Sequence, residues 1–248
     1  MKFARFFLPI DVALLALLLM PTAATTLETA RMALPDGFRA ESEQLQFSGF
    51  GGHNKGTWRV AGYQGDFTRG ESRLGVFDPL YVSNKGKGSF TFTSDGSSEP
   101  LAVACVMKKK SVTIDIVTFD PKKMSYDCEF RRAGDLTGDR LTMGQPKPVG
   151  MKERILAKDA RVGEAIIAGQ HLTLKSVHKY EGTPISSQAP VGYLVDMADR
   201  TVAAIELTDW NPVVYLRKDL EPVTRDAMLV AALAIAVLRD PANSALED

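Results

Sequence analysis

The feature that most constrains the fold is an apolar run near the C-terminus. Twelve consecutive residues, Ala227 to Leu238, carry no polar side chain. A helix that is apolar on every face must be surrounded by protein. The run is too short to cross a bilayer, which takes about 20 apolar residues. We therefore predict a core helix that the rest of the chain encloses.

The flanking residues predict where this helix begins and ends, over 224–239. Thr224 can serve as the N-cap, and Asp226 would lie in the first turn, near the positive end of the helix dipole. Arg239 suits the last turn, and Pro241 prevents further helix.

Most of the remaining chain alternates between apolar and polar residues in short segments separated by turn residues. This pattern predicts strands at 44–48, 57–61, 65–69, 73–77, 89–93, 101–106, 112–117, 125–130, 165–168, 171–177, 191–195, 201–207 and 213–217. Closely spaced short strands favour a sandwich or barrel over βαβ units. With the apolar helix, they predict a mainly β fold: a closed or nearly closed antiparallel barrel of about a dozen strands around the helix.

Three connecting segments are also predicted. Residues 131–139 and 144–150 read as loops, and Asp199–Arg200 reads as the turn of a hairpin.

The N-terminus has the pattern of a secretory signal peptide over residues 1–24. Lys2 and Arg5 precede an apolar stretch at 12–20, and Pro21 to Ala24 supplies small residues for cleavage after Ala24. We expect a periplasmic or secreted protein. One residue does not fit this pattern: Asp11 is a charge at the start of the apolar stretch. A retained membrane anchor is the alternative.

The predicted signal peptide sets the domain organisation. A leader follows at 25–42, with a short helix over 26–34. A single barrel domain spans 43–240, and 241–248 form a tail.

Two cysteines, Cys105 and Cys128, lie in strand-like sequence. An even count in an exported chain favours a disulfide, and two buried thiols are the alternative. A metal site would need further ligands nearby, and the sequence has none.

The net charge of the chain indicates which class of partner it is suited to bind. Without Lys2, Arg5 and Asp11 the net charge is close to −1. This disfavours nucleic acid, because phosphate binding needs a basic face.

The segment Val191–Arg217 followed by Arg225–Asp240 resembles the end of the tubby-like barrel superfamily, which includes tubby C-terminal domains, LURP-one-related proteins and phospholipid scramblases. The resemblance implies about twelve strands closing around a central hydrophobic helix. Familiar members are intracellular, so their inositol-lipid binding is not transferred, and no family ligand residue is mapped onto this chain.

Candidate catalytic residues are few. His171 and His178 would lie about 23 Å apart along one strand on opposite faces, and His53 belongs to a Gly-rich turn at 49–56. Ser72 lacks the spacing of a nucleophile elbow, and neither HExxH nor CxxC occurs. We therefore assign no catalytic, cofactor-binding or metal-binding residue and expect no cofactor.

The densest basic cluster is Lys108, Lys109 and Lys110 with Lys122 and Lys123, which we place in the turns of a three-stranded meander at 101–130. These lysines could contact anionic lipid head groups, or they could be solvated charges that protect edge strands.

Three functions remain. The first is an exported, non-enzymatic binding or envelope-associated module with a protein or lipid partner. The second is a hydrolase-type enzyme whose site residues are dispersed along the chain. The third is a peripheral membrane protein that binds anionic lipid. Because the helix fills the barrel, we expect any ligand at the rim or on the outer wall. The sequence leaves the oligomeric state open.

Overall fold

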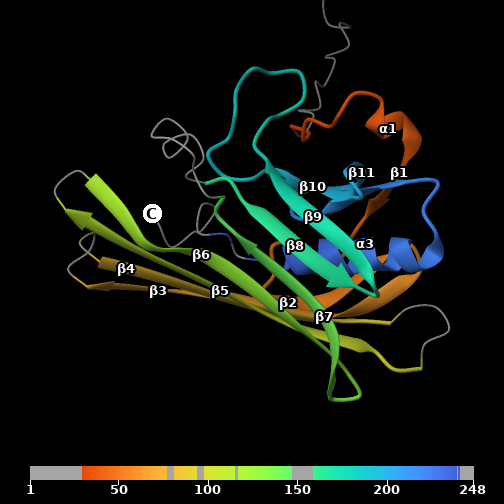
Figure 1. The fold of residues 1–248 in the computed structure, drawn as a ribbon, viewed down its shortest axis with the longest axis horizontal. Helices are drawn as coiled ribbons and strands as arrows, with labels where there is room; N and C mark the ends of the chain where they lie inside the picture. Colours follow the sequence, from red (N-terminus) through yellow and green to blue (C-terminus); the bar gives the residue numbers. More distant parts are fainter. Residues whose placement is uncertain are drawn as a thin grey trace, which may run out of the picture.

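The computed structural model describes residues 30–76, 81–93, 98–114, 117–146, 159–238 and 240. Its strands form one antiparallel sheet that curves around the C-terminal helix α3 (Figure 1). The strands are β1 (Ser42–Gln46), β2 (Lys55–Val60), β3 (Tyr63–Val76), β4 (Tyr81–Phe92), β5 (Leu101–Ile114), β6 (Val117–Arg132), β7 (Asp135–Gly144), β8 (Val162–Ile167), β9 (Gln170–Val177), β10 (Gly192–Met197), β11 (Arg200–Glu206) and β12 (Val213–Arg217).

The sheet is a nearly closed barrel. Its order runs β1, β12, β11 and so on down to β2, so β1 and β2 form the two edges. Next to these edges, Ser48 and Arg59 exchange backbone hydrogen bonds of 2.9 and 3.0 Å. The predicted fold, a mainly β barrel enclosing a C-terminal helix, is confirmed.

Helix α3 (Pro222–Ala236) supplies the centre of the core. Every residue from Ala227 to Val237 is at least 96% buried. The predicted bounds of the helix were wrong: Glu221 is the N-cap and Pro222 the first helical residue, where the missing N–H of proline is not needed. Thr224 therefore lies inside the first turn. Arg239 and the tail lie outside the described residues.

Side chains of the barrel wall satisfy the last carbonyl groups of α3. The Tyr126 hydroxyl on β6 donates to Ala234 O at 2.5 Å, and Arg69 on β3 donates to Ala236 O at 3.0 Å. Gly88 on β4 permits the helix end to approach, since a Cβ there would lie 2.8 Å from Val237 O. The barrel wall thus provides partners that the end of a helix lacks.

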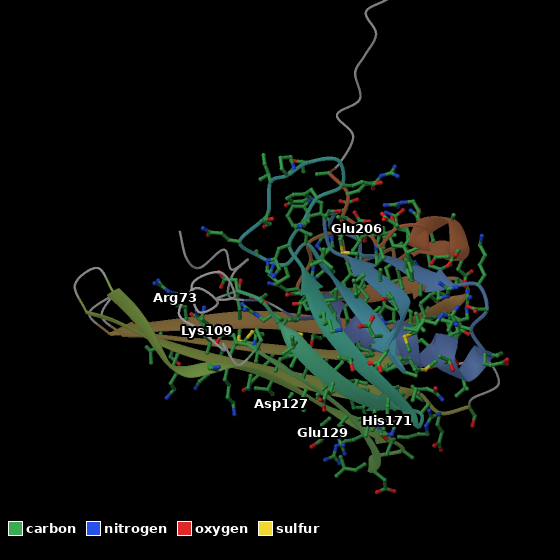
Figure 2. All side chains as sticks on the ribbon, turned by 45° about the horizontal axis from the view of Figure 1, so that its top comes forward. Arg73, Lys109, Asp127, Glu129, His171 and Glu206 are labelled. Atoms are coloured by element: carbon green, nitrogen blue, oxygen red, sulfur yellow. A yellow bond between two sulfur atoms is a disulfide. The ribbon has the colours of Figure 1, made fainter. Side chains whose placement is uncertain are left out.

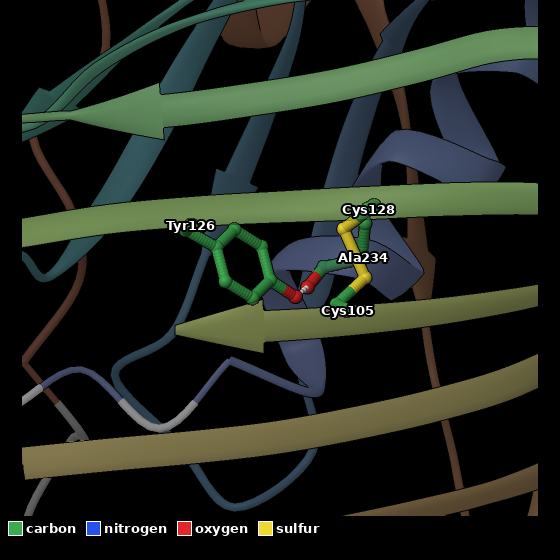
Figure 3. The surroundings of a disulfide bond; sticks show 4 residues. All are labelled: Cys105, Tyr126, Cys128 and Ala234. Atoms are coloured by element: carbon green, nitrogen blue, oxygen red, sulfur yellow. Dashed lines mark hydrogen bonds between the residues drawn. A yellow bond between two sulfur atoms is a disulfide. The ribbon is translucent and has the colours of Figure 1, made fainter. Parts of the chain in front are cut away.

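A disulfide joins β5 and β6 and faces the helix (Figure 3). Cys105 lies directly opposite Cys128, with an S–S distance of 2.07 Å. The predicted meander was wrong, because 112–117 is not a separate middle strand. Residues 101–114 and 117–132 form two long paired strands instead. Over 101–107 and 124–130, every second side chain is apolar and buried in the core.

Three other predicted boundaries also differ from the structure. Residues 131–139 are not a loop: β6 and β7 join through a tight turn at Ala133 and Gly134, both with positive φ. The predicted strands at 65–69 and 73–77 are one strand, β3, up to Val76, and Phe77 lies outside the described residues. The turn between β10 and β11 lies at Ala198 and Asp199, one residue before its predicted place.

The leader packs on the outer face of β10 to β12. Residues 30–34 are not helical, contrary to the predicted helix at 26–34, and residues 1–29 lie outside the described part. The Met32 backbone N–H donates to the buried Glu206 at 2.7 Å, and the Tyr215 hydroxyl donates to the same carboxylate at 2.9 Å. A one-turn helix, α1 (Phe38–Glu41), follows.

No helix of the described segments is long and apolar enough to span a membrane.

Candidate functional site

Strands β3 to β6 are the longest of the sheet, with 14, 12, 14 and 16 residues. Their ends project beyond the helix as an extended arm, which Figure 1 shows on the left. We call the projecting part of these four strands the β-arm.

Exposed lysines gather on the outer face of the β-arm. Lys85 on β4 lies directly opposite Lys108 on β5, and Lys87 lies opposite Val106. We call Lys85, Lys87 and Lys108 the lysine face. Lys110, half-buried, and Lys123, exposed, flank it.

The ammonium groups of the lysine face are not paired with any carboxylate of the described segments. Among the described residues, no hydrogen bond or ion pair involves the ammonium groups of Lys85, Lys87 or Lys108. Like charges directly opposite each other on neighbouring strands are destabilising. The lysine face is therefore suited to an external anion.

The predicted basic residues are only partly brought together. Lys108 is exposed, whereas Lys109 points inward and is 8% exposed, because the side chains of β5 alternate between the two faces (Figure 2). Lys123 donates to Pro146 O at 3.3 Å. The side chain of Lys122 lies outside the described residues.

The lysines lie within strands rather than in turns, which corrects the predicted placement. Sequence reasoning also missed Lys85 and Lys87, because the glycines at 86 and 88 made this stretch read as a turn. The sequence did contain a signal: lysine and glycine alternate from Lys85 to Gly88. This alternation has the same period of two residues as the predicted strand at 89–93, which follows it directly.

The residues around the lysine face include both apolar and acidic side chains. Val106 and Leu74 expose 36% and 63% of their surface. Toward the barrel, Asp127 lies opposite Val106, and Glu129 follows on the same face of β6 (Figure 2). A shallow groove of about 250 Å³ lies beyond them, lined mainly by small side chains of β3 to β5.

A second hollow opens at the barrel rim, at the carboxyl end of α3, with a volume of about 240 Å³. We call it the rim pocket. It is lined by Arg69, Pro190, Tyr193, Leu207, Asp209, Trp210, Pro212, Ile235, Ala236, Leu238 and Asp240. It therefore lies at the inner side of the sheet, opposite the side that carries the lysine face.

Two of the charged residues that line the rim pocket, Asp240 and Arg69, already have partners. Asp240 forms a bidentate ion pair with the buried Arg161, at 2.7 and 2.9 Å. Arg69 donates to Ala236 O and, at 2.8 Å, to His53 O. In contrast, the buried Tyr193 hydroxyl has no hydrogen-bond partner in the described part of the chain, and its burial raises the pKa of this phenol well above the usual value.

The histidines lie in three separate places. His53 is in the exposed loop before β2, and His171 is exposed on β9. His178 contacts Ser176 Oγ and Ser187 O through its two ring nitrogens, at 2.9 and 3.2 Å. Within the described segments, no three metal-ligating side chains cluster. Ser72 is exposed on β3.

No protein-family model, curated protein or solved structure matches this chain. The resemblance to the tubby-like superfamily therefore stays a prediction without support from these comparisons.

Proposed function

We propose that the chain is an exported, non-enzymatic binding module that attaches to anionic lipid surfaces through the lysine face of its β-arm. The observation that carries this proposal is the pairing of Lys85 opposite Lys108, with no ion pair to either among the described residues. An anionic surface would relieve the repulsion between the two ammonium groups.

Two further features support a lipid surface. Val106 and Leu74 place exposed apolar side chains beside the ammonium groups. Basic residues mixed with apolar ones are typical of proteins that lie in the head-group region of a membrane. The net charge of the whole chain is zero, so attraction would depend on the local concentration of lysine rather than on overall charge.

Vesicle co-sedimentation tests the proposal. The full mature chain is mixed with vesicles of phosphatidylcholine alone or with added phosphatidylglycerol, at low and high salt. We expect sedimentation only with phosphatidylglycerol, and loss of it at high salt, because exposed charges are screened. Absence of binding to the anionic vesicles at low salt would refute the proposal.

Variants that remove lysine charges test which surface of the protein binds the vesicles. Each lysine near an anionic membrane contributes about 1 kcal/mol, so Lys85→Gln with Lys108→Gln should weaken binding about thirtyfold. The matched control is Lys179→Gln with Lys218→Gln, which removes the same charge from exposed sites just after β9 and β12. Lys218 also donates to Ala40 O at 3.0 Å, so the melting temperature of the control is measured as well. Equal loss in both double variants would show that only total charge matters and that the lysine face is not the site.

A further inference from the structure

The rim pocket has an exposed tryptophan at its mouth. Trp210 is 71% exposed, the largest exposed fraction among the large apolar side chains of the described residues. A single exposed apolar side chain is ordinary, but a tryptophan that lines a concave pocket provides a flat apolar surface for a ligand.

Trp210 is held in place by the glycine-rich loop before β2. Its ring rests on Gly52, where a Cβ atom would lie 2.9 Å from the ring. The next residue, Asn211, accepts hydrogen bonds from Phe50 N and Gly51 N at 3.1 and 3.2 Å. The glycine-rich loop thus supports the Trp210 ring, which forms an aromatic platform. A supported ring loses little conformational entropy when a ligand binds.

The pocket supplies a hydrogen-bonding group. At the mouth, one oxygen of the exposed Asp209 carboxylate accepts a hydrogen bond from Trp210 N at 2.6 Å. The other oxygen is an acceptor that suits the hydroxyl groups of a ligand. The Tyr193 ring lines the wall, but its hydroxyl is buried away from the pocket surface.

The electrostatics of the pocket favour a neutral ligand. The carboxyl end of α3 and Asp209 disfavour anions. Arg69 places a positive charge against the helix end, and Arg161 neutralises Asp240, which together disfavour organic cations. With anions and organic cations disfavoured, the ligand that fits best is a neutral molecule. It would have an apolar face to contact Trp210 and hydroxyl groups at its edge.

We propose that the rim pocket binds a neutral sugar ring that stacks on Trp210 and hydrogen-bonds to Asp209. A pyranose presents C–H bonds on its face and hydroxyls along its edge, and a pocket of about 240 Å³ is large enough for one ring. This function is independent of the lysine face, which lies on the other side of the sheet.

NMR of the ¹⁵N-labelled protein tests the proposal directly, because the chain has only two tryptophans. The probes are glucose, galactose, mannose, N-acetylglucosamine and their short oligosaccharides, with choline and inorganic phosphate as comparison compounds. We expect a saturable shift of the Trp210 indole resonance at millimolar concentrations of at least one sugar. The resonance of Trp58, which is fully buried, should not move.

Variants separate ligand binding from folding. Trp210→Ala should abolish the sugar interaction, measured by saturation transfer to the sugar protons, and leave the melting temperature unchanged. Asp209→Asn should weaken it about tenfold without lowering stability, since the side chain is exposed and the amide oxygen can still accept from Trp210 N. Ile185→Ala, which removes a 69% exposed apolar side chain elsewhere, is the matched control and should bind as wild type.

Three results would overturn the proposal: no sugar of the panel shifts Trp210, choline or phosphate shifts it in place of the sugars, or Trp210→Ala binds sugar with unchanged affinity.

Discussion

The hydroxyl of Tyr126 on β6 donates a 2.5 Å hydrogen bond to the carbonyl oxygen of Ala234 in the last turn of α3 (Figure 3). The Leu238 N–H, which would be the next helical donor for that carbonyl, bonds Ile235 O instead. The helix end is thus tied to the wall that encloses it, and the bond lies in the dry core.

Loss of this hydroxyl should be costly. Tyr126→Phe keeps the ring but leaves a buried carbonyl without its donor, so we expect the free energy of unfolding to fall by about 1 to 3 kcal/mol. Urea denaturation measures the change. Tyr180→Phe is the control, because the Tyr180 side chain is half-buried and its hydroxyl makes no hydrogen bond to any described residue. Equal stability of the Tyr126 variant and wild type would contradict the structural role of this bond.

A charge on the enclosed helix should prevent folding. Ala232→Asp or Ala234→Asp would bury a carboxylate with no partner, and both positions are fully buried. We expect insoluble or unfolded protein by circular dichroism. Ala133→Asp, in an exposed turn where aspartate tolerates a positive φ, should fold normally. A soluble Ala232→Asp variant with a normal melting curve would show that α3 is not enclosed.

Alkaline pH should destabilise the fold through its buried phenols. Burial raises the pKa of Tyr126 and Tyr193 above the ordinary value near 10. Above pH 10 the unfolded chain loses these protons while the folded chain keeps them. The free energy of unfolding is therefore unaffected below about pH 10 and falls as the pH rises toward the folded-state pKa.

Tyrosinate absorbance recorded together with circular dichroism checks this expectation. The chain has six tyrosines. The phenols of Tyr126 and Tyr193 should ionise only as the structure is lost. Ionisation of all six near pH 10 with an unchanged dichroism spectrum is the contrary outcome.

The disulfide should contribute to stability. It closes a separation of 23 residues, for which the chain-entropy model gives about 3 kcal/mol. Urea unfolding with and without reductant measures the loss. The double variant Cys105→Ala with Cys128→Ala should be destabilised by a similar amount and respond no further to reductant. Labelling of both thiols in the purified, non-reduced protein would rule out the bridge.

The apolar run and the alternating strands were sufficient to predict the architecture. Hydrophobicity on all sides of Ala227–Leu238 requires enclosure, and period-two alternation specifies strands, so the barrel and its central helix follow from local pattern. The two cysteines also gave the disulfide. The lengths of the strands were harder to predict, because Gly86 and Gly88 have the sequence pattern of a turn. Only the structure shows that Gly88 lies in β4, where it fits beside the end of the helix.

The sequence by itself therefore determined the class of fold, the core helix and the cysteine pair. Only the tertiary structure decided which side chains meet. The register of β4 and β5 places Lys85 opposite Lys108, which lie far apart along the chain, and turns Lys109 inward. The rim pocket likewise joins Arg69, Tyr193, Trp210 and the end of α3. Pattern reveals which face of an element is buried, whereas contacts between distant segments depend on strand order and register, which are set by packing around the whole barrel.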